Sequence, residues 1–276
     1  VVALLQKCTK PVVAIFLGEK PENHEGKVYL AHTLEETARM AVDLANGDPI
    51  KDNYCDPINY EVSKPLAADK TVKGLYSGGS LAAEAGMLIA EALNLGGLIK
   101  EEGYILKTGG YEVVDLGDDV YTQGKPHPMI DPEVRIKKIL ECAKDPQTGV
   151  ILLDCMLGYG CHPDMAGALA PAIREAQEIA KADGRELYFV ASVCGTRQDP
   201  QDYDRAVAEL KECGVLVEES NARAIRLALK LKGIDYKENS RGHVDVAVDE
   251  TPLPEPDEKV MELLNTKPRV INVGVR

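Results

Sequence analysis

Two glycine-rich segments place residue types that can hold an anion where a strand gives way to a helix. The first segment is Ser77, Gly78, Gly79 and Ser80, and the second is Gly158, Tyr159, Gly160, Cys161 and His162. Glycine lets the backbone approach a ligand, and the first turn of a helix offers unpaired N–H groups with partial positive charge. Each segment therefore predicts a phosphate-binding loop, or else a plain tight turn in which Ser80 caps one helix and Pro163 begins the other.

A third segment, "GKPHPMIDP", holds His127 between two prolines. Proline fixes its own φ and restricts the residue before it, so the segment suits a side chain held at a site. We interpret His127 as a hydrogen-bond donor or proton-exchange group, and Lys125 or Arg135 as the partner of a carboxylate or phosphate. Four aspartates surround it: Asp115, Asp118, Asp119 and Asp131. The alternative is that the prolines only shape a loop and that Asp131 only caps a helix.

Three cysteines and a histidine fall near the ends of two later strands, namely Cys155, Cys161, His162 and Cys194. A metal site or a thiolate nucleophile would use such residues, but they lack a compact spacing such as CxxC, so no metal is predicted. We expect His162 to contact a phosphate from the start of its helix. Arg197 follows the fourth strand and either reaches the same place or is a surface arginine.

Regular alternation of strands and helices from Lys73 onward must position these residues. Strands are expected at 74–76, 112–115, 150–155, 187–192 and 215–217, and helices at 80–95, 131–143, 163–182, 200–213 and 220–232. This pattern predicts an α/β fold with a flavodoxin-like doubly wound parallel sheet. In that fold the first and third strands are neighbours where the winding reverses. The two glycine-rich loops should then line one crevice, with their helices pointing amino ends at the same anion.

The flanking parts of the chain follow other patterns. Residues 1–50 hold a buried strand at 12–17, with no earlier strand to form its sheet, and a helix with a capping box at Thr33 and Glu36 and a stop at Gly47. Residues 51–72 are expected to be a linker, 73–235 the main domain, and 236–276 a polar tail leading to a further truncated segment.

Composition restricts the partners. The net charge of −13 disfavours binding to nucleic acid or anionic lipid, and the absence of Trp disfavours base stacking. No stretch approaches the roughly 18 apolar residues of a membrane span. Seven cysteines without a small-scaffold spacing predict free thiols in a reducing cytoplasm. We therefore expect a cytoplasmic protein with a local anion site and neither nucleic-acid nor membrane partners.

The motifs also carry a family resemblance. "SGGSLAAEA" and "GYGCHPDMAGALAPAI" resemble the phosphate-facing loops in the ligase domains of succinyl-CoA synthetase and its relatives. The sequence is more similar to the FdrA proteins of that superfamily, through "KPVVAIFLG", "HTLEETARMAV", "DLGDDVYTQGKPHPMIDPEVR" and "PRVINVGV" in that order. The resemblance implies the carboxyl-terminal half of an FdrA protein. Residues 1–50 would be the remnant of a first ligase-like domain, and 73–235 a second ligase domain.

The resemblance also implies an activity. FdrA proteins are associated with ureide (allantoin) breakdown and with carbamoyl transfer, in which oxalurate and phosphate give oxamate and carbamoyl phosphate. Such a subunit needs an anion crevice but neither CoA nor a phosphohistidine. We therefore expect phosphate or carbamoyl phosphate as a substrate, no certain cofactor, and assembly with other subunits or as a homo-oligomer.

Two alternatives stay open. An NDP-forming acyl-CoA synthetase, similar to succinyl-CoA synthetase, would use nucleotide, CoA and a phosphohistidine, for which His24 and His32 are the candidates. Neither histidine has the small-residue, glycine-rich surroundings of the family's phosphohistidine loop, which disfavours thioester synthesis. The third possibility is a non-catalytic binding or assembly subunit that uses the crevice as a sensor or an interface.

Overall fold

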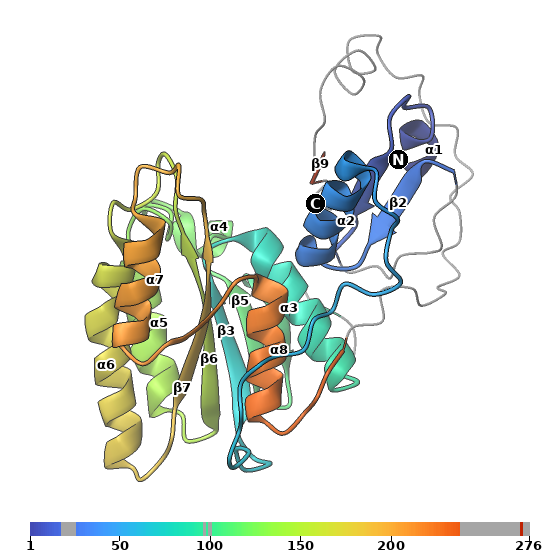
Figure 1. The fold of residues 1–276 in the computed structure, drawn as a ribbon. Coiled ribbons are helices and arrows are strands. Elements are labelled where there is room, and N and C mark those ends of the chain that lie inside the picture. Colours follow the sequence, from blue (N-terminus) through green and yellow to red (C-terminus); the bar gives the residue numbers. More distant parts are fainter. Residues whose placement is uncertain (18–25, 96–97, 99–100, 238–270, 273–276) are drawn as a thin grey trace. The chain divides into compact units, whose positions relative to one another are not determined.

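The computed structural model describes residues 1–17, 26–95, 98, 101–237 and 271–272 (Figure 1). The chain divides into two compact units, Val1–Asp56 with Glu238–Arg276, and Pro57–Lys237. The expected main domain at 73–235 lies within the second unit, together with most of the expected linker.

The first unit contains a small parallel sheet with the strand order β2-β1-β9. Its elements are α1 (Val2–Leu5), β1 (Val12–Ile15), β2 (Val28–Ala31), α2 (Leu34–Asn46) and β9 (Ile271–Asn272). The strand expected at 12–17 therefore has partners on both sides, one of them from near the end of the chain. The cap prediction for α2 is confirmed, because Thr33 Oγ1 accepts the Glu36 N–H and Gly47 ends the helix at φ 79°.

The second unit is built on a six-stranded sheet with the order β4-β5-β3-β6-β7-β8. The strands are β3 (Thr71–Tyr76), β4 (Tyr104–Thr108), β5 (Tyr111–Asp115), β6 (Thr148–Met156), β7 (Tyr188–Cys194) and β8 (Leu216–Glu218). All neighbours pair in parallel except β4, which is antiparallel to β5. The five parallel strands follow the flavodoxin-like order, so the predicted fold is confirmed, and β3 and β6 are neighbours where the winding reverses.

Helices cover both faces of this sheet (Figure 1). They are α3 (Gly79–Ala92), α4 (Asp119–Thr122), α5 (Glu133–Lys144), α6 (Met165–Ala182), α7 (Tyr203–Glu212) and α8 (Asn221–Leu231). Helices α3 and α8 pack together on one face, and α5, α6 and α7 pack in sequence on the other. The central strand β6 serves both cores, with Leu152 buried toward α3 and α8 and Leu153 toward α5 and α6.

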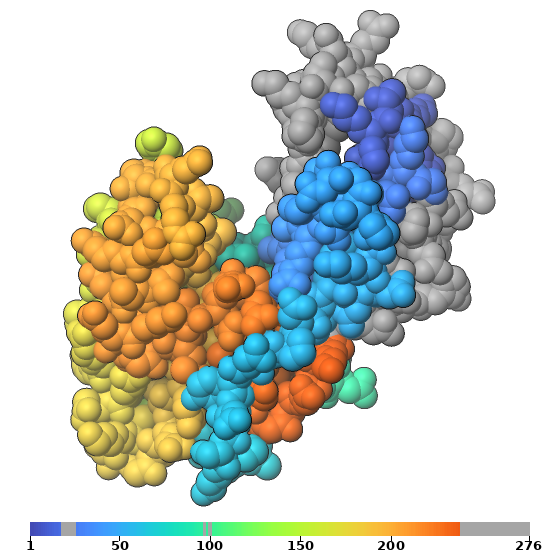
Figure 2. Space-filling view, viewed as in Figure 1, coloured from blue at the N-terminus to red at the C-terminus, as the bar shows by residue number. Residues whose placement is uncertain are grey.

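The segment before β3 is part of the second unit. It runs along α8, where Leu66 N–H donates to the Leu231 carbonyl and Lys230 Nζ donates to the Ile58 carbonyl. Figure 2 shows this segment lying over α8 on the surface of the unit. The prolines of the expected linker therefore shape a packed strap.

The expected helix starts differ from the observed ones by one to three residues, and two of these differences bear on the site. Helix α3 begins at Gly79 with Gly78 at the cap position, so Ser80 is not its cap. Helix α6 begins at Met165 after Asp164, whose Oδ1 accepts the Gly167 N–H, so Pro163 stands just outside the helix. Among the helices that the structure describes, none combines the length and apolar character needed to cross a bilayer.

Candidate functional site

The loops that follow β3 and β6 leave neighbouring strands at the same edge of the sheet, and a carboxylate on β6 holds the loop after β3. Asp154 on β6 accepts the Ser77 N–H at 2.9 Å, the Gly78 N–H at 2.8 Å and the Ser77 hydroxyl at 3.0 Å. Ser77 and Asp154 are buried. The chain's own carboxylate therefore occupies the amide groups in front of α3, where the sequence interpretation places a bound phosphate.

Arg135 completes this arrangement from α5. Its Nη2 lies 2.9 Å from Asp154 Oδ1 and also donates to the Asp154 carbonyl, and both side chains are 0% exposed. Two expectations are corrected here. Ser77 and Gly78 give these N–H groups to Asp154, and Arg135 is too deeply buried to meet a substrate. Through Asp154, these three residues fix the start of α3 against β6.

The second glycine-rich loop is held by one glutamine from the β7–α7 connection. Gln201 Oε1 accepts the Gly158 N–H at 2.9 Å, and Gln201 Nε2 donates to the carbonyls of Gly158 and His162 at 3.0 and 3.2 Å. Gly158 and Gly160 have φ of 131° and 84°, values that favour glycine. The Tyr159 side chain between them is 91% exposed. The loop is therefore a sharp, clamped turn with an exposed aromatic tip.

The two histidines of the candidate site stand in matching His-Pro turns. His127 Nδ1 accepts the Met129 N–H at 3.2 Å, and His162 Nδ1 accepts the Asp164 N–H at 3.0 Å. Each neutral ring therefore carries its proton on Nε2. The turns are also joined, because His162 N–H donates to the Met129 carbonyl at 2.7 Å. The loops after β5 and β6 thus place two imidazoles of fixed tautomer at one edge of the sheet.

A carboxylate that the sequence interpretation gave no role, Asp115, lies at the centre of these loops. Its Oδ1 accepts the Gly117 N–H at 2.8 Å, and its Oδ2 lies 2.7 Å from where a Cβ would stand on Gly79. His127 Nε2 lies 2.6 Å from the corresponding point on Gly117. Burial raises the pKa of Asp115, and the charges of Asp118 and Asp154 act in the same direction.

The remaining predicted cations and histidines lie elsewhere. Lys125 is exposed on the loop before His127, and Arg197 forms a double hydrogen bond with Asp204 at the start of α7. His32 lies in the first unit and is 1% exposed, with its N–H donating to Glu36 Oε2. His24 lies outside the described residues.

Burial disfavours the thiolate form of the three cysteines near the ends of β6 and β7. Burial raises the pKa of the Cys155 thiol to about 12, and burial also raises the pKa of Cys161 and Cys194. Within the ranges that the structure describes, no three His, Cys, Asp or Glu side chains are grouped so that they could hold a metal ion. Thiolate chemistry therefore has no support at these positions.

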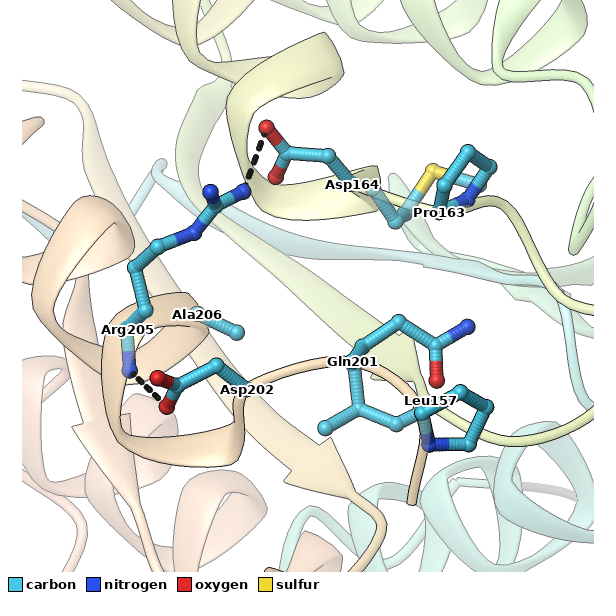
Figure 3. Close-up of a pocket in the computed structure, with 9 residues that line it drawn as sticks. Leu157, Pro163, Asp164, Gln201, Asp202, Arg205 and Ala206 are labelled. Carbon is cyan, nitrogen blue, oxygen red and sulfur yellow. Dashed lines mark hydrogen bonds and ion pairs between the residues drawn. The ribbon is translucent and has the colours of Figure 1, made fainter.

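A cavity of about 250 Å³ lies on the far side of the Gly158–His162 loop, between the starts of α6 and α7 (Figure 3). Carboxylates already fill both helix starts, because Asp164 Oδ1 accepts the Gly167 N–H and Asp202 Oδ1 accepts the Arg205 N–H. Arg205 in turn pairs with Asp164 at 2.8 Å. This cavity is therefore poorly suited to an anion, and the candidate site is the group of Asp115 and His127 beside Gly117.

The Gln201 clamp gives a first test. Gln201→Leu keeps the size of the side chain but removes three hydrogen bonds, and we expect the Gly158 amide to exchange with solvent about tenfold faster, which is ~1.4 kcal/mol of local stability. Hydrogen exchange followed by mass spectrometry measures it. Gln198→Leu is the control, because Gln198 is exposed on the same connection. Equal exchange in the two variants would mean that the glycines alone hold the turn.

Comparison with known proteins covers the region that holds this site. A family model described as CoA-ligase matches residues 75–231. Over 238 residues the chain is 35% identical to the "Uncharacterized protein YahF" of Escherichia coli (strain K12). The match covers 80% of this chain and 45% of that protein, so the chain spans about half the length of this curated relative. Both glycine-rich loops, Asp115 and His127 fall inside the region that the family model matches.

Proposed function

The chain belongs to the CoA-ligase family, and from this we propose that it is the part of an acyl-CoA synthetase-like enzyme that handles an acyl or carbamoyl phosphate beside Asp115 and His127. The observation that carries the proposal is the joining of three loops at the switch point. Asp154 connects the loop after β3 to β6, and the His162–Met129 hydrogen bond connects the loops after β5 and β6. A small anion placed there would meet N–H donors from two imidazoles.

We assign the finer activity to carbamoyl transfer, in which oxalurate and phosphate give oxamate and carbamoyl phosphate. The FdrA-like segment "DLGDDVYTQGKPHPMIDPEVR" supports this choice, because it contributes both Asp115 and His127 to the site. In this proposal Gly79, Ser80 and the loop from Gly158 to His162 border the phosphate, and His127 donates a hydrogen bond to it. Lys125 pairs with the oxamate carboxylate from the rim.

Calorimetry tests the proposed substrate class. We expect the chain, with any subunits that co-purify with it, to bind carbamoyl phosphate. The His127→Ala variant should bind it more weakly than the wild type does. The control is His32→Ala, because His32 lies in the first unit. Titrations with phosphate, oxamate and CoA run in parallel. Binding of CoA without carbamoyl phosphate would overturn the assignment.

The family itself favours a second candidate, an NDP-forming acyl-CoA synthetase. This activity requires a phosphohistidine, and the buried side chain of His32 disfavours that residue as a phosphoryl acceptor. Incubation with ATP or GTP labelled at the γ-phosphate distinguishes the two activities. A label on His24 or His32 would favour the synthetase, and an unlabelled protein would favour carbamoyl transfer.

The proposed enzyme works with partners. Because the chain spans about half of its curated relative, we assign the remaining catalytic groups to other subunits or to a homo-oligomer. The exposed Tyr159, Ile130 and Val120 support this assignment, since all three side chains are apolar or aromatic and stand on loops or a short helix at the edge of the sheet that holds the site.

A further inference from the structure

We propose that Asp115 is the proton-transferring residue of this site, working over Gly117 beside His127. The proposal rests on the proposed carbamoyl transfer and adds to it the group that carries the proton. Asp115 is the last residue of β5 and pairs in register with Tyr76, the last residue of β3. It therefore stands at the switch point itself, ahead of the first residue of α3.

The geometry gives Asp115 one oxygen that is held by the Gly117 N–H and a second oxygen that lies against Gly79. Oδ1 accepts the Gly117 N–H, which sets the orientation of the carboxyl group, while Oδ2 lies against Gly79. A Cβ on Gly117 would stand 3.1 Å from Asp115 Oδ1 and 2.6 Å from His127 Nε2. Both side chains therefore crowd against the backbone of Gly117, and only glycine at this position lets them stand so close together.

The two carboxylates at the switch point have different surroundings. Asp154 is fully buried, accepts two backbone N–H groups and a hydroxyl, and pairs with Arg135. Asp115 accepts the Gly117 N–H. Burial together with the charges of Asp118 and Asp154 raises its pKa, opposed by the Gly117 hydrogen bond and then by His127. One carboxylate is thus fully engaged in structural contacts, while the other has fewer such contacts among the described residues and stands beside an imidazole, which suits a proton-exchanging group.

The proton can be followed through the reaction. As an oxygen of hydrogen phosphate attacks the carbamoyl carbon of oxalurate, Asp115 takes the proton of that phosphate. The bond between the carbamoyl carbon and the oxamate nitrogen then breaks, and Asp115 returns the proton to this nitrogen. The products are oxamate and carbamoyl phosphate, with Asp115 a carboxylate again. His127 donates its Nε2 hydrogen to the substrate oxygen where negative charge develops.

The test is Asp115→Asn, which preserves the acceptor for the Gly117 N–H. We expect carbamoyl phosphate to bind about as in the wild type, while kcat falls by about 100-fold or more. We also expect the wild type to lose activity at low pH as Asp115 becomes protonated, and the variant to lack this pH dependence. Asp119→Asn, an exposed neighbour on α4, is the control and should keep the wild-type rate and pH profile.

A stability measurement separates a chemical role from a folding defect. Because the pKa of Asp115 is raised in the folded state, folding is most favourable when the carboxyl group is protonated and loses stability as pH rises through that pKa. Asp115→Asn should therefore be at least as stable as the wild type at neutral pH, with the difference vanishing in acid.

The failures are distinguishable. If the wild type catalyses carbamoyl transfer and Asp115→Asn keeps its rate or its pH profile, the role of Asp115 is wrong and the proposed function stands. If Asp115→Asn is less stable than the wild type at neutral pH, the carboxylate is structural and the proposal is overturned. If the wild type neither binds carbamoyl phosphate nor forms it, the proposed function and this role fail together.

Discussion

Replacing Arg135 by Met is expected to lower the free energy of unfolding of the second unit by about 3–5 kcal/mol. Arg135 and Asp154 are both 0% exposed and lie 2.9 Å apart. Removing the guanidinium leaves a buried carboxylate without its counter-charge, and the Asp154 carbonyl loses a donor. Native-state hydrogen exchange of the β3 and β6 amides in urea measures the loss in the second unit alone.

A neutral side chain at position 154 should restore part of the stability that Arg135→Met removes. In the double variant Arg135→Met with Asp154→Asn, no unpaired charge remains, and the Asn oxygen still accepts from the Ser77 and Gly78 N–H groups. We expect the double variant to be more stable than the two single losses together predict. Lys137→Met on the same helix is the control, because its side chain is 76% exposed. A loss below about 1 kcal/mol in Arg135→Met would show that the pair does not hold α3 to β6.

The strand order follows from the sequence because it depends on a global pattern. The apolar run that becomes β6 is buried along almost its whole length, as a central parallel strand requires, and helices alternate with the parallel strands around it. Such a pattern tolerates errors of a residue or two at each boundary. The switch point between β3 and β6 is therefore predictable.

The helix starts are less predictable where a distant residue replaces a local cap. Ser80 is a reasonable cap from its neighbours, but the amides in front of α3 donate to Asp154, 76 positions away. The lone aspartate within an apolar strand was the available signal, because a buried carboxylate must have partners. No comparable signal exists for the burial of Arg135, which looks like an ordinary charged residue of an amphipathic helix.

Strand β4 was missed even though its turn has a clear signature. Gly109 and Gly110 have φ of 57° and 85°, and they connect Thr108 to its antiparallel partner Tyr111. Two glycines between runs of alternating apolar residues are typical of a two-residue hairpin. The alternation of strands and helices predicts only parallel strands, and it therefore does not indicate this antiparallel edge strand. The hairpin matters for the site because it leads directly into β5 and Asp115.

The contacts at the start of α3 disfavour an anion site made of its backbone amides. A helix start that already holds Asp154 gains little from a phosphate at the same amides, since the two anions would repel each other. Binding strength must then come from the side chains on the neighbouring loops, His127 and His162, and from the residues that border Gly117. For this reason the group of side chains around Gly117, and not the Ser77–Gly78 turn, is where a substitution should affect ligand binding most.

Gly117→Ala is accordingly expected to reduce activity on carbamoyl phosphate by about 100-fold or more, since a misplacement of about 1 Å at a site can cost this much. The new Cβ would stand 2.6 Å from His127 Nε2 and 3.0 Å from the Ser77 carbonyl. The Ser77 carbonyl belongs to the backbone and cannot turn away, so His127 must leave its place. Steady-state kinetics with carbamoyl phosphate and oxamate measure the effect.

Gly149→Ala is the matched control, because Gly149 is equally crowded but lies near the start of β6, at the opposite end of the strand from the site. Its Cβ would stand 2.8 Å from Lys70 Cβ and 3.0 Å from Leu66 Cδ1. Both substitutions should cost about 1–3 kcal/mol of stability through overpacking. Only Gly117→Ala should lose activity beyond that, because only Gly117 borders Asp115 and His127. Equal activity in the two variants would mean that the substrate binds away from Gly117. The chemistry assigned to the loops after β3, β5 and β6 would then be wrong.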